Sequence, residues 1–241
     1  MLGLGHRLGF VAQPATVAFS PLSISGLKLW LDASQISGLN DGDALTTWSD
    51  SSGLGNDATQ AAGTKKPLYK TAIQNGLPVV RFDGVDDVLK TPIFDQFTAK
   101  RGTIFVVSKS AHTTSYRIGL NTYTGAGIGF QFIYTKSGTA YKWFSNPGDF
   151  ASLVYDPSVF DLQTINRTGD TAMAFRRNGA LETTWAITNN QPAARVLEVG
   201  AWDGSSHLPG DIALVLMYNS SLSSGDVGLV ESWINARYLL Y

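Results

Sequence analysis

The sequence predicts a single all-β domain, an antiparallel two-sheet β-sandwich closed by one C-terminal helix. Apolar residues mostly alternate with polar ones or form short runs that end at Gly, Asn, Asp or Pro, which is the pattern of strands. Only 15% of the residues are charged, against about 25% in an average globular protein, and this favours short polar turns over charged helices. Helical spacing is convincing only near the C-terminal end.

The strands can be placed from their apolar patterns. The clearest spans 127–135, where alternate residues are apolar as in a half-buried strand. Segments 104–107 and 212–218 are apolar on both faces, so they should be central strands that are covered on each side. Asn178-Gly179 predicts a two-residue type I′ hairpin, because both turn positions need a positive φ. Besides 127–135, the expected strands are 27–32, 79–83, 103–109, 162–167, 171–177, 195–200 and 211–218, and the two segments that are apolar on both faces lie within 103–109 and 211–218.

The helix is expected to begin after Ser223 or Ser224, either of which can act as N-cap. Asp226 in its first turn would meet the positive end of the helix dipole. No linker or repeat divides the chain, which predicts one domain at 23–241 preceded by an arm at 1–22 that either docks or is a disordered tail. The residues that recur at helical spacing, and should therefore face the sandwich, are Val227, Val230, Ile234 and Tyr238.

Composition excludes several classes of partner. The net charge is −1 and no extended Lys/Arg cluster occurs, so phosphate-driven binding of nucleic acid has no electrostatic basis. The longest apolar run, 212–218, is far shorter than the roughly 18 to 20 residues of a membrane-spanning helix, so no membrane insertion is expected. The absence of cysteine excludes disulfides, thiolate zinc sites and cysteine nucleophiles.

Several motifs carry a family resemblance. In their order and spacing they resemble laminin-G-like domains, of the concanavalin A-like jelly-roll type found in phage structural proteins and bacterial surface proteins. The resemblance implies a jelly-roll fold and says little about activity, since one fold hosts unrelated functions. Many relatives carry a Glu where this chain has Leu214, so packing should replace a polar contact there. The motifs are GLKLWLDA at 26–33, WSDSSG at 48–53, NDAT at 56–59, PVVRFDGVDD at 78–87, RRNG at 176–179, PGDIA at 209–213 and WINARY at 233–238.

The aspartates of these motifs are expected to serve turns, with Asp50 and Asp83 accepting hydrogen bonds from nearby backbone N–H groups. The functional alternative is a calcium site formed by Asp83, Asp86 and Asp87, since the resemblance includes domains that bind calcium. The chain lacks an ordered ligand series such as an EF-hand loop. No cofactor is therefore expected, with calcium as the alternative.

Catalytic motifs are missing. The three glutamates, Glu182, Glu198 and Glu231, are far apart in the sequence and do not form the paired-carboxylate strand motif of glucanases. No Gly-x-Ser-x-Gly pentapeptide occurs, and the three histidines are isolated. The chain is therefore predicted not to be an enzyme, and glycoside hydrolysis is kept only as a remote alternative.

Two functions remain. The first is a virion structural protein, such as a capsid decoration, head-fibre or tail component, located in the virion with other virion proteins and copies of itself as partners. The second is a carbohydrate-binding or adhesion domain of an extracellular or cell-surface protein that binds glycans. Aromatic side chains in turn-rich segments would then stack on sugar rings, although ordinary packing of part-buried aromatic residues is the favoured explanation for them. These glycan-site candidates are Tyr123, Tyr141, Trp143 and Trp202.

Overall fold

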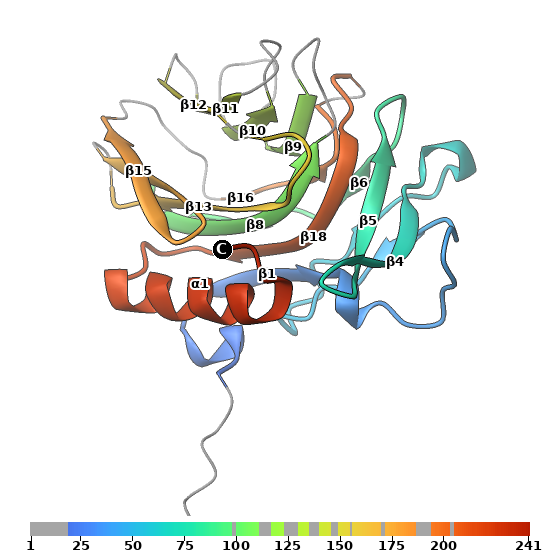
Figure 1. Ribbon diagram of the computed structural model, residues 1–241, viewed down its shortest axis with the longest axis horizontal. Coiled ribbons are helices and arrows are strands. Elements are labelled where there is room, and N and C mark those ends of the chain that lie inside the picture. The colour runs from blue at the N-terminus through green and yellow to red at the C-terminus, as the bar shows by residue number, and fades with distance from the viewer. Residues whose placement is uncertain are drawn as a thin grey trace, which may run out of the picture.

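The computed structural model is a β-sandwich covered on one side by a helix (Figure 1). Within the described residues, two eight-stranded antiparallel sheets are present, together with a small two-stranded sheet. This confirms the predicted fold class. The structure describes residues 19–97, 100–110, 117–122, 130–134, 140–145, 149–154, 156–169, 172–186, 194–202 and 205–241.

The first sheet has the strand order β15-β14-β13-β8-β18-β5-β4, and β1 pairs with β18 beside β5. The second has the order β12-β11-β10-β9-β17-β6-β3-β2, and β7 pairs with β16. The strands of the first sheet are β1 (Leu27–Asp32), β4 (Leu68–Gln74), β5 (Leu77–Asp83), β8 (Gly102–Ser110), β13 (Asp161–Arg167), β14 (Met173–Arg177), β15 (Ala180–Trp185) and β18 (Pro209–Tyr218). The others are β2 (Thr47–Trp48), β3 (Ala58–Thr59), β6 (Leu89–Lys90), β7 (Phe94–Asp95), β9 (Arg117–Asn121), β10 (Phe130–Tyr134), β11 (Ala140–Ser145), β12 (Asp149–Val154), β16 (Ala194–Arg195) and β17 (Glu198–Val199).

β8 and β18 are the central strands, as their apolar sequences predict. β18 pairs with β8 on one edge, and on the other edge it pairs first with β5 and then with β1. A shift in register between Ile212 and Leu214 lies where the partner changes. In β8, Ile104 and Val106 enter the core between the sheets, whereas Phe105 and Val107 enter the core beneath the helix.

The helix α1 (Ser224–Tyr238) covers the outer face of the first sheet (Figure 1). Ser223 is its N-cap, because the Ser223 side chain accepts a hydrogen bond from the N–H of Asp226. Leu214 packs in the core beneath the helix, as expected from its departure from the family pattern. The helix residues buried there include all four that the spacing predicts: Val227, Val230, Ile234 and Tyr238.

The predicted hairpin is confirmed. Asn178 and Gly179 have φ of 49° and 78°, and they connect β14 to β15. The Asn178 amide also donates a hydrogen bond to Asp161 at 2.7 Å, while its oxygen accepts one from the N–H of Leu162 at 2.9 Å. The turn is therefore anchored to the neighbouring strand β13 as well as to its own hairpin.

The prediction of one strand at 195–200 was wrong. The chain forms two short strands there, β16 and β17, which belong to different sheets. Between them, the N–H of Leu197 donates to the Thr91 hydroxyl, and the N–H of Thr91 donates to the Leu197 carbonyl. The side chain of Thr91 thus replaces a strand partner and allows the chain to pass from one sheet to the next.

The described chain begins against the body of the domain. The ring of Phe19 meets that of Trp233 edge-on at 6.3 Å, and the carbonyl of buried Pro21 accepts a hydrogen bond from Tyr218. Short 3-10 helices occur at η1 (Pro21–Ser23), η2 (Ala33–Gln35) and η3 (Gly63–Lys65). The boundary expected at residue 22 stays a prediction.

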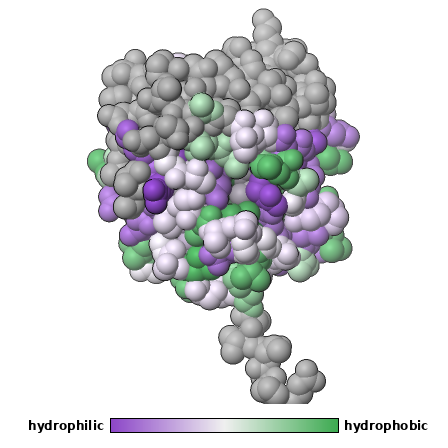
Figure 2. All heavy atoms as spheres, turned by 90° about the vertical axis from the view of Figure 1, so that its left-hand side faces the viewer, coloured by the Kyte–Doolittle hydropathy of each residue, from purple (hydrophilic) through white to green (hydrophobic). Residues whose placement is uncertain are grey.

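The surface mixes polar and apolar residues. On the face in Figure 2, hydrophilic and hydrophobic residues are interspersed, with hydrophobic ones gathered low in the middle. No helix among the described residues is long and apolar enough to cross a membrane.

Candidate functional site

Of the four aromatic glycan-site candidates, two lie in the same strand, one lies in a separate turn and one is outside the described residues. Tyr123 lies outside the described residues. Tyr141 and Trp143 both belong to β11, opposite Leu153 and Ala151 of β12. Trp202 belongs to a separate tight turn, where its backbone exchanges two hydrogen bonds with Ser205. Their role in glycan binding stays a prediction.

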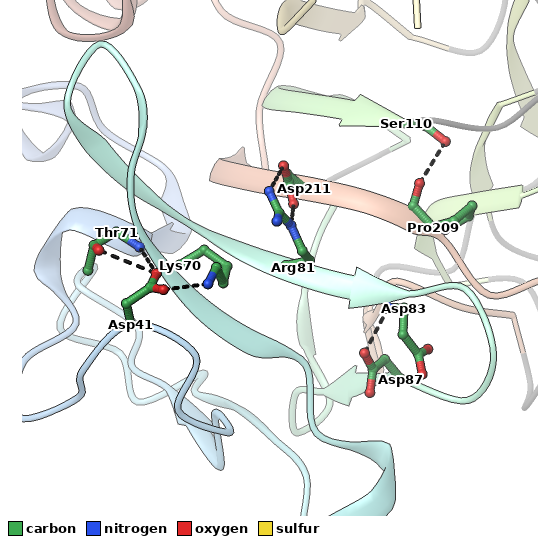
Figure 3. Close-up of polar contacts among 9 residues, drawn as sticks. All are labelled: Asp41, Lys70, Thr71, Arg81, Asp83, Asp87, Ser110, Pro209 and Asp211. Carbon is green, nitrogen blue, oxygen red and sulfur yellow. Dashed lines mark hydrogen bonds and ion pairs between the residues drawn. The ribbon is translucent and has the colours of Figure 1, made fainter. Parts of the chain in front are cut away.

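The three candidate calcium ligands do come together, in the turn that follows β5. Carboxylate oxygens of Asp83, Asp86 and Asp87 lie within 4.8 Å of one another. Asp83 accepts hydrogen bonds from the N–H groups of Val85 and Asp86, and Asp87 accepts one from the N–H of Asp83 (Figure 3). These bonds are the turn contacts expected of Asp83, and they use acceptor capacity that an ion would need. Calcium binding here stays a prediction.

This turn carries more negative charge than the fold favours. Burial raises the pKa of Asp87 to about 6, and the charges of Asp83 and Asp86 act in the same direction. His207 is buried within electrostatic reach of the same carboxylates, and burial lowers its pKa although Asp86 and Asp83 oppose the shift. At neutral pH the carboxylate of Asp87 is thus poorly compensated.

Two other acidic residues nearby are neutralised by cations. On the outer face of the first sheet, the Arg81 guanidinium forms two hydrogen bonds with the Asp211 carboxylate, at 2.7 Å and 2.9 Å. In the neighbouring strand β4, Lys70 forms an ion pair with Asp41 (Figure 3). The hydrogen bonds with Asp211 raise the pKa of Arg81, and those from Lys70 lower the pKa of Asp41.

The three glutamates also form ion pairs. Glu182 lies 2.9 Å from Arg177, Glu198 lies 2.7 Å from Lys90, and Glu231 lies 2.8 Å from Arg176. Arg176 holds Glu231 in a two-pronged contact that connects the helix to β14. Each glutamate thus has a structural partner, and the prediction that the chain is not an enzyme stays a prediction.

A polar hollow of about 370 Å³ lies in the segment that follows β1. At its start, the Asp32 carboxylate accepts hydrogen bonds from the backbone and hydroxyl of Ser34 and thereby caps η2. The chain then reaches β4, where Ala44 forms a bridge, and returns to β1, where Asp50 forms another. The residues that line the polar hollow are Asp32, Gln35, Ile36, Ser37, Leu39, Ala44, Leu45, Thr46, Thr47, Ser49 and Ser51.

The lining of the polar hollow is rich in hydrogen-bonding groups that the protein does not use. Within the part of the chain that the structure describes, six of its polar side chains make no hydrogen bond to protein groups. Each offers both donor and acceptor atoms. They are Gln35, Ser37, Thr46, Thr47, Ser49 and Ser51.

The one acidic residue of the polar hollow is already engaged. Asp32 is fully buried, accepts two hydrogen bonds from Ser34, and forms an ion pair with Arg237 at 2.9 Å. The free groups are therefore neutral hydroxyls and an amide, with partly buried Ile36 and Leu39 beside them. Such a lining suits a neutral, hydroxyl-rich ligand and offers no free acid or base for catalysis.

Sequence reasoning missed the polar hollow. Short polar residues such as Ser37 and Thr47 are typical of turns, and nothing in their spacing indicates a common ligand. The available signal is the run of hydroxyl residues on either side of Trp48, whose indole is buried.

Comparisons with known proteins define the fold. A sialidase from Trypanosoma rangeli, in complex with a difluoro-KDN compound, matches with a TM-score of 0.64 and 14% identity, over 91% of this chain and 35% of that chain. The binding domain of botulinum neurotoxin serotype D matches with a TM-score of 0.61 and 12% identity, over 86% of this chain and 52% of that chain. The chain thus spans about a third to a half of these proteins. At such identities the likeness shows the β-sandwich fold alone.

No family model matches the sequence, and no curated protein matches it either. The fold implied by the laminin-G-like resemblance is therefore shown by structure, whereas its link to phage proteins has no support in the comparisons. The virion location and virion partners stay predictions.

Proposed function

We propose that this chain is a carbohydrate-binding domain that holds a neutral sugar in the polar hollow. The observation that carries the proposal is the set of six polar side chains, around one hollow of about 370 Å³, that make no hydrogen bond to described protein groups. Sugars present neighbouring hydroxyls that both donate and accept, and serine and threonine hydroxyls can match either role by rotating.

The shape of the polar hollow fits this use. Its volume is near the lower end of the range for small-ligand sites, about 300 to 1,000 Å³, so one or two sugar rings are the expected occupant. Ile36 and Leu39 provide apolar contact for the C–H face of a ring. Because most of the lining is open to water, hydrogen bonds with the sugar replace bonds with water, and the affinity should be modest.

The fold likeness agrees with a recognition role. One matched structure is described as a receptor-binding domain, from botulinum neurotoxin D, and another is a Trypanosoma rangeli sialidase in complex with sialic acid. The match covers 33% of that sialidase chain, so its activity is not carried over to this chain. A non-enzymatic glycan-binding module is the function that the fold and the polar hollow support together.

The proposal is tested with a glycan array, followed by titration calorimetry on the saccharides that bind. The double variant Thr47→Val/Ser49→Ala removes two hydroxyls of the polar hollow and leaves the buried Trp48 between them intact. We expect it to weaken binding by about tenfold or more, because each lost hydrogen bond is worth about 1 kcal/mol.

The matched control is Thr184→Val/Ser232→Ala, which makes the same chemical changes at exposed positions of β15 and α1. It should bind sugar like the wild type. Equal affinity in the polar-hollow variant, with its thermal unfolding unchanged, would contradict the site. Absence of any binding saccharide for the folded wild type would contradict the function.

A further inference from the structure

The sequence contains two Asn-Gly pairs, and both form the turn of a two-residue hairpin. Asn75-Gly76 connects β4 to β5, and Asn178-Gly179 connects β14 to β15. The φ angles are nearly the same, 48° and 73° in the first pair and 49° and 78° in the second. The two turns therefore have similar backbone geometry, and a difference in their reactivity must come from what surrounds them.

Asparagine followed by glycine is prone to spontaneous deamidation. The backbone nitrogen of the glycine attacks the side-chain Cγ of the asparagine, the bond from Cγ to the amide nitrogen breaks, and that nitrogen leaves as ammonia with the proton of the glycine N–H. Water then opens the succinimide ring at either carbonyl, which gives aspartate or isoaspartate. Glycine favours the attack because it has no side chain beside the attacking nitrogen. The ring cannot close within a type I′ turn, so the turn must first open locally.

The turn at Asn178 is held by contacts outside its own hairpin. The Asn178 side chain donates to Asp161 and accepts from the N–H of Leu162, and the Asn178 backbone N–H donates to the Leu162 carbonyl at 2.9 Å. The ring of Tyr241 packs against Gly179, so closely that a Cβ on this glycine would lie 2.9 Å from it. Local opening of this turn would therefore break contacts with a neighbouring strand and with the C-terminal tail.

The turn at Asn75 is open by comparison. Both Asn75 and Gly76 are exposed, and a Cβ on this glycine would meet no atom within 4 Å. The preceding strand β4 lies at the edge of its sheet, and its register with β5 shifts between Lys70 and Gln74. Among the described residues, the Asn75 side chain makes one hydrogen bond, from its amide to the Arg237 carbonyl at 2.8 Å. Local opening should therefore be easier here than at the other turn.

We infer that Asn75 is a site of spontaneous deamidation, and that its reaction with water loosens the attachment of the last turn of α1 to the β4–β5 hairpin (Figure 1). The amide that donates to the Arg237 carbonyl becomes a carboxylate, which cannot donate. Its negative charge also lies at the negative end of the helix dipole. A repulsive contact thus replaces an attractive one. This inference is independent of the proposed sugar site.

The first test incubates the folded full chain at mildly alkaline pH and follows both sites by peptide mapping with mass spectrometry, which detects the conversion of an amide to an acid. Asn75 should deamidate about tenfold faster than Asn178, because its turn opens more readily. The matched control is the same chain in guanidinium chloride, where both turns are unfolded and the two sites should react at similar rates. Equal rates in the folded chain, or a faster reaction at Asn178, would overturn the inference.

The second test measures the consequence for α1, by hydrogen exchange of the Leu239 N–H, which donates to the Asn235 carbonyl at the end of the helix. Asn75→Asp introduces the charge of the product and should speed this exchange about fivefold. The control Asn75→Gly suits the same turn and removes the amide without adding a charge, so its rate should lie between those of the wild type and Asn75→Asp. An exchange rate in Asn75→Asp equal to that of the wild type would show that deamidation leaves the end of α1 in place.

Discussion

Single carboxylates organise several turns of this protein. Asp50 accepts hydrogen bonds from the N–H groups of Trp30, Ser52 and Asn56, so one side chain joins β1 to the loop after β2. Asp83 has the same role after β5. In both cases a short acidic side chain replaces backbone partners that a tight turn lacks.

Asp87 differs because its charge opposes folding. Burial raises the pKa of Asp87 from 3.8 to about 6, so between these values the folded state binds more protons than the unfolded state. The contribution of this group to stability is therefore most favourable at low pH and falls as the pH rises through that window. Above pH 6 the full penalty applies.

We predict that Asp87→Asn stabilises the protein at pH 7.5, because the amide oxygen can still accept the hydrogen bond from Asp83 without a buried charge. The expected rise in Tm is a few degrees, since about 1 kcal/mol shifts a chain of this size by about 2 to 4 °C. Thermal melts in EDTA at pH 7.5 and 4.5 should show a gain at pH 4.5 of half or less. A gain independent of pH would contradict the account of Asp87.

At the scale of elements, α1 is held at both ends by specific polar contacts. Its N-terminus is capped by Ser223. At its C-terminus, the hairpin between β4 and β5 supplies Gln74 and Asn75, whose amides donate to the carbonyls of Tyr238 and Arg237. The helix is therefore fastened to the sheet by its last turn as well as by its apolar face.

The N-cap gives a direct prediction. Ser223→Ala should lower the free energy of unfolding by about 1 kcal/mol, because the N–H of Asp226 loses its acceptor. Ser224→Ala is the control: it changes the adjacent exposed serine, which does not cap the helix, and should have an effect near zero. Urea unfolding of both variants decides this. Equal losses would show that Ser223 is not the functional cap.

At the scale of the whole molecule, three layers support the candidate sites. The helix, the first sheet and the second sheet enclose two apolar cores, on either side of the first sheet. The polar hollow lies at the edge of the core between the sheets, where buried Leu45 lines it, and most of its lining comes from the segment between β1 and β3. Ligand-binding residues can therefore vary without loss of the core, as is common for loops on a rigid scaffold.

The sequence was sufficient for features that depend on local pattern. The helix and its cap, the Asn178-Gly179 hairpin and the central place of β8 and β18 follow from spacing, turn chemistry and two-sided apolarity. The passage between sheets near Leu197 was not predictable, because it depends on a hydrogen bond to the distant Thr91.

The polar hollow was missed for a different reason. The polar hollow is local in the chain but is lined by serines and threonines that any turn could contain.

The central claim is that the polar hollow binds sugar, and the most direct test is to map backbone amide NMR shifts during titration with a saccharide that binds on the array. The account predicts that the largest shifts cluster in residues 35–51, without added calcium, and that they disappear in Thr47→Val/Ser49→Ala. Shifts centred instead on β11 or on the turn at Trp202 would contradict the claim and favour the aromatic candidates.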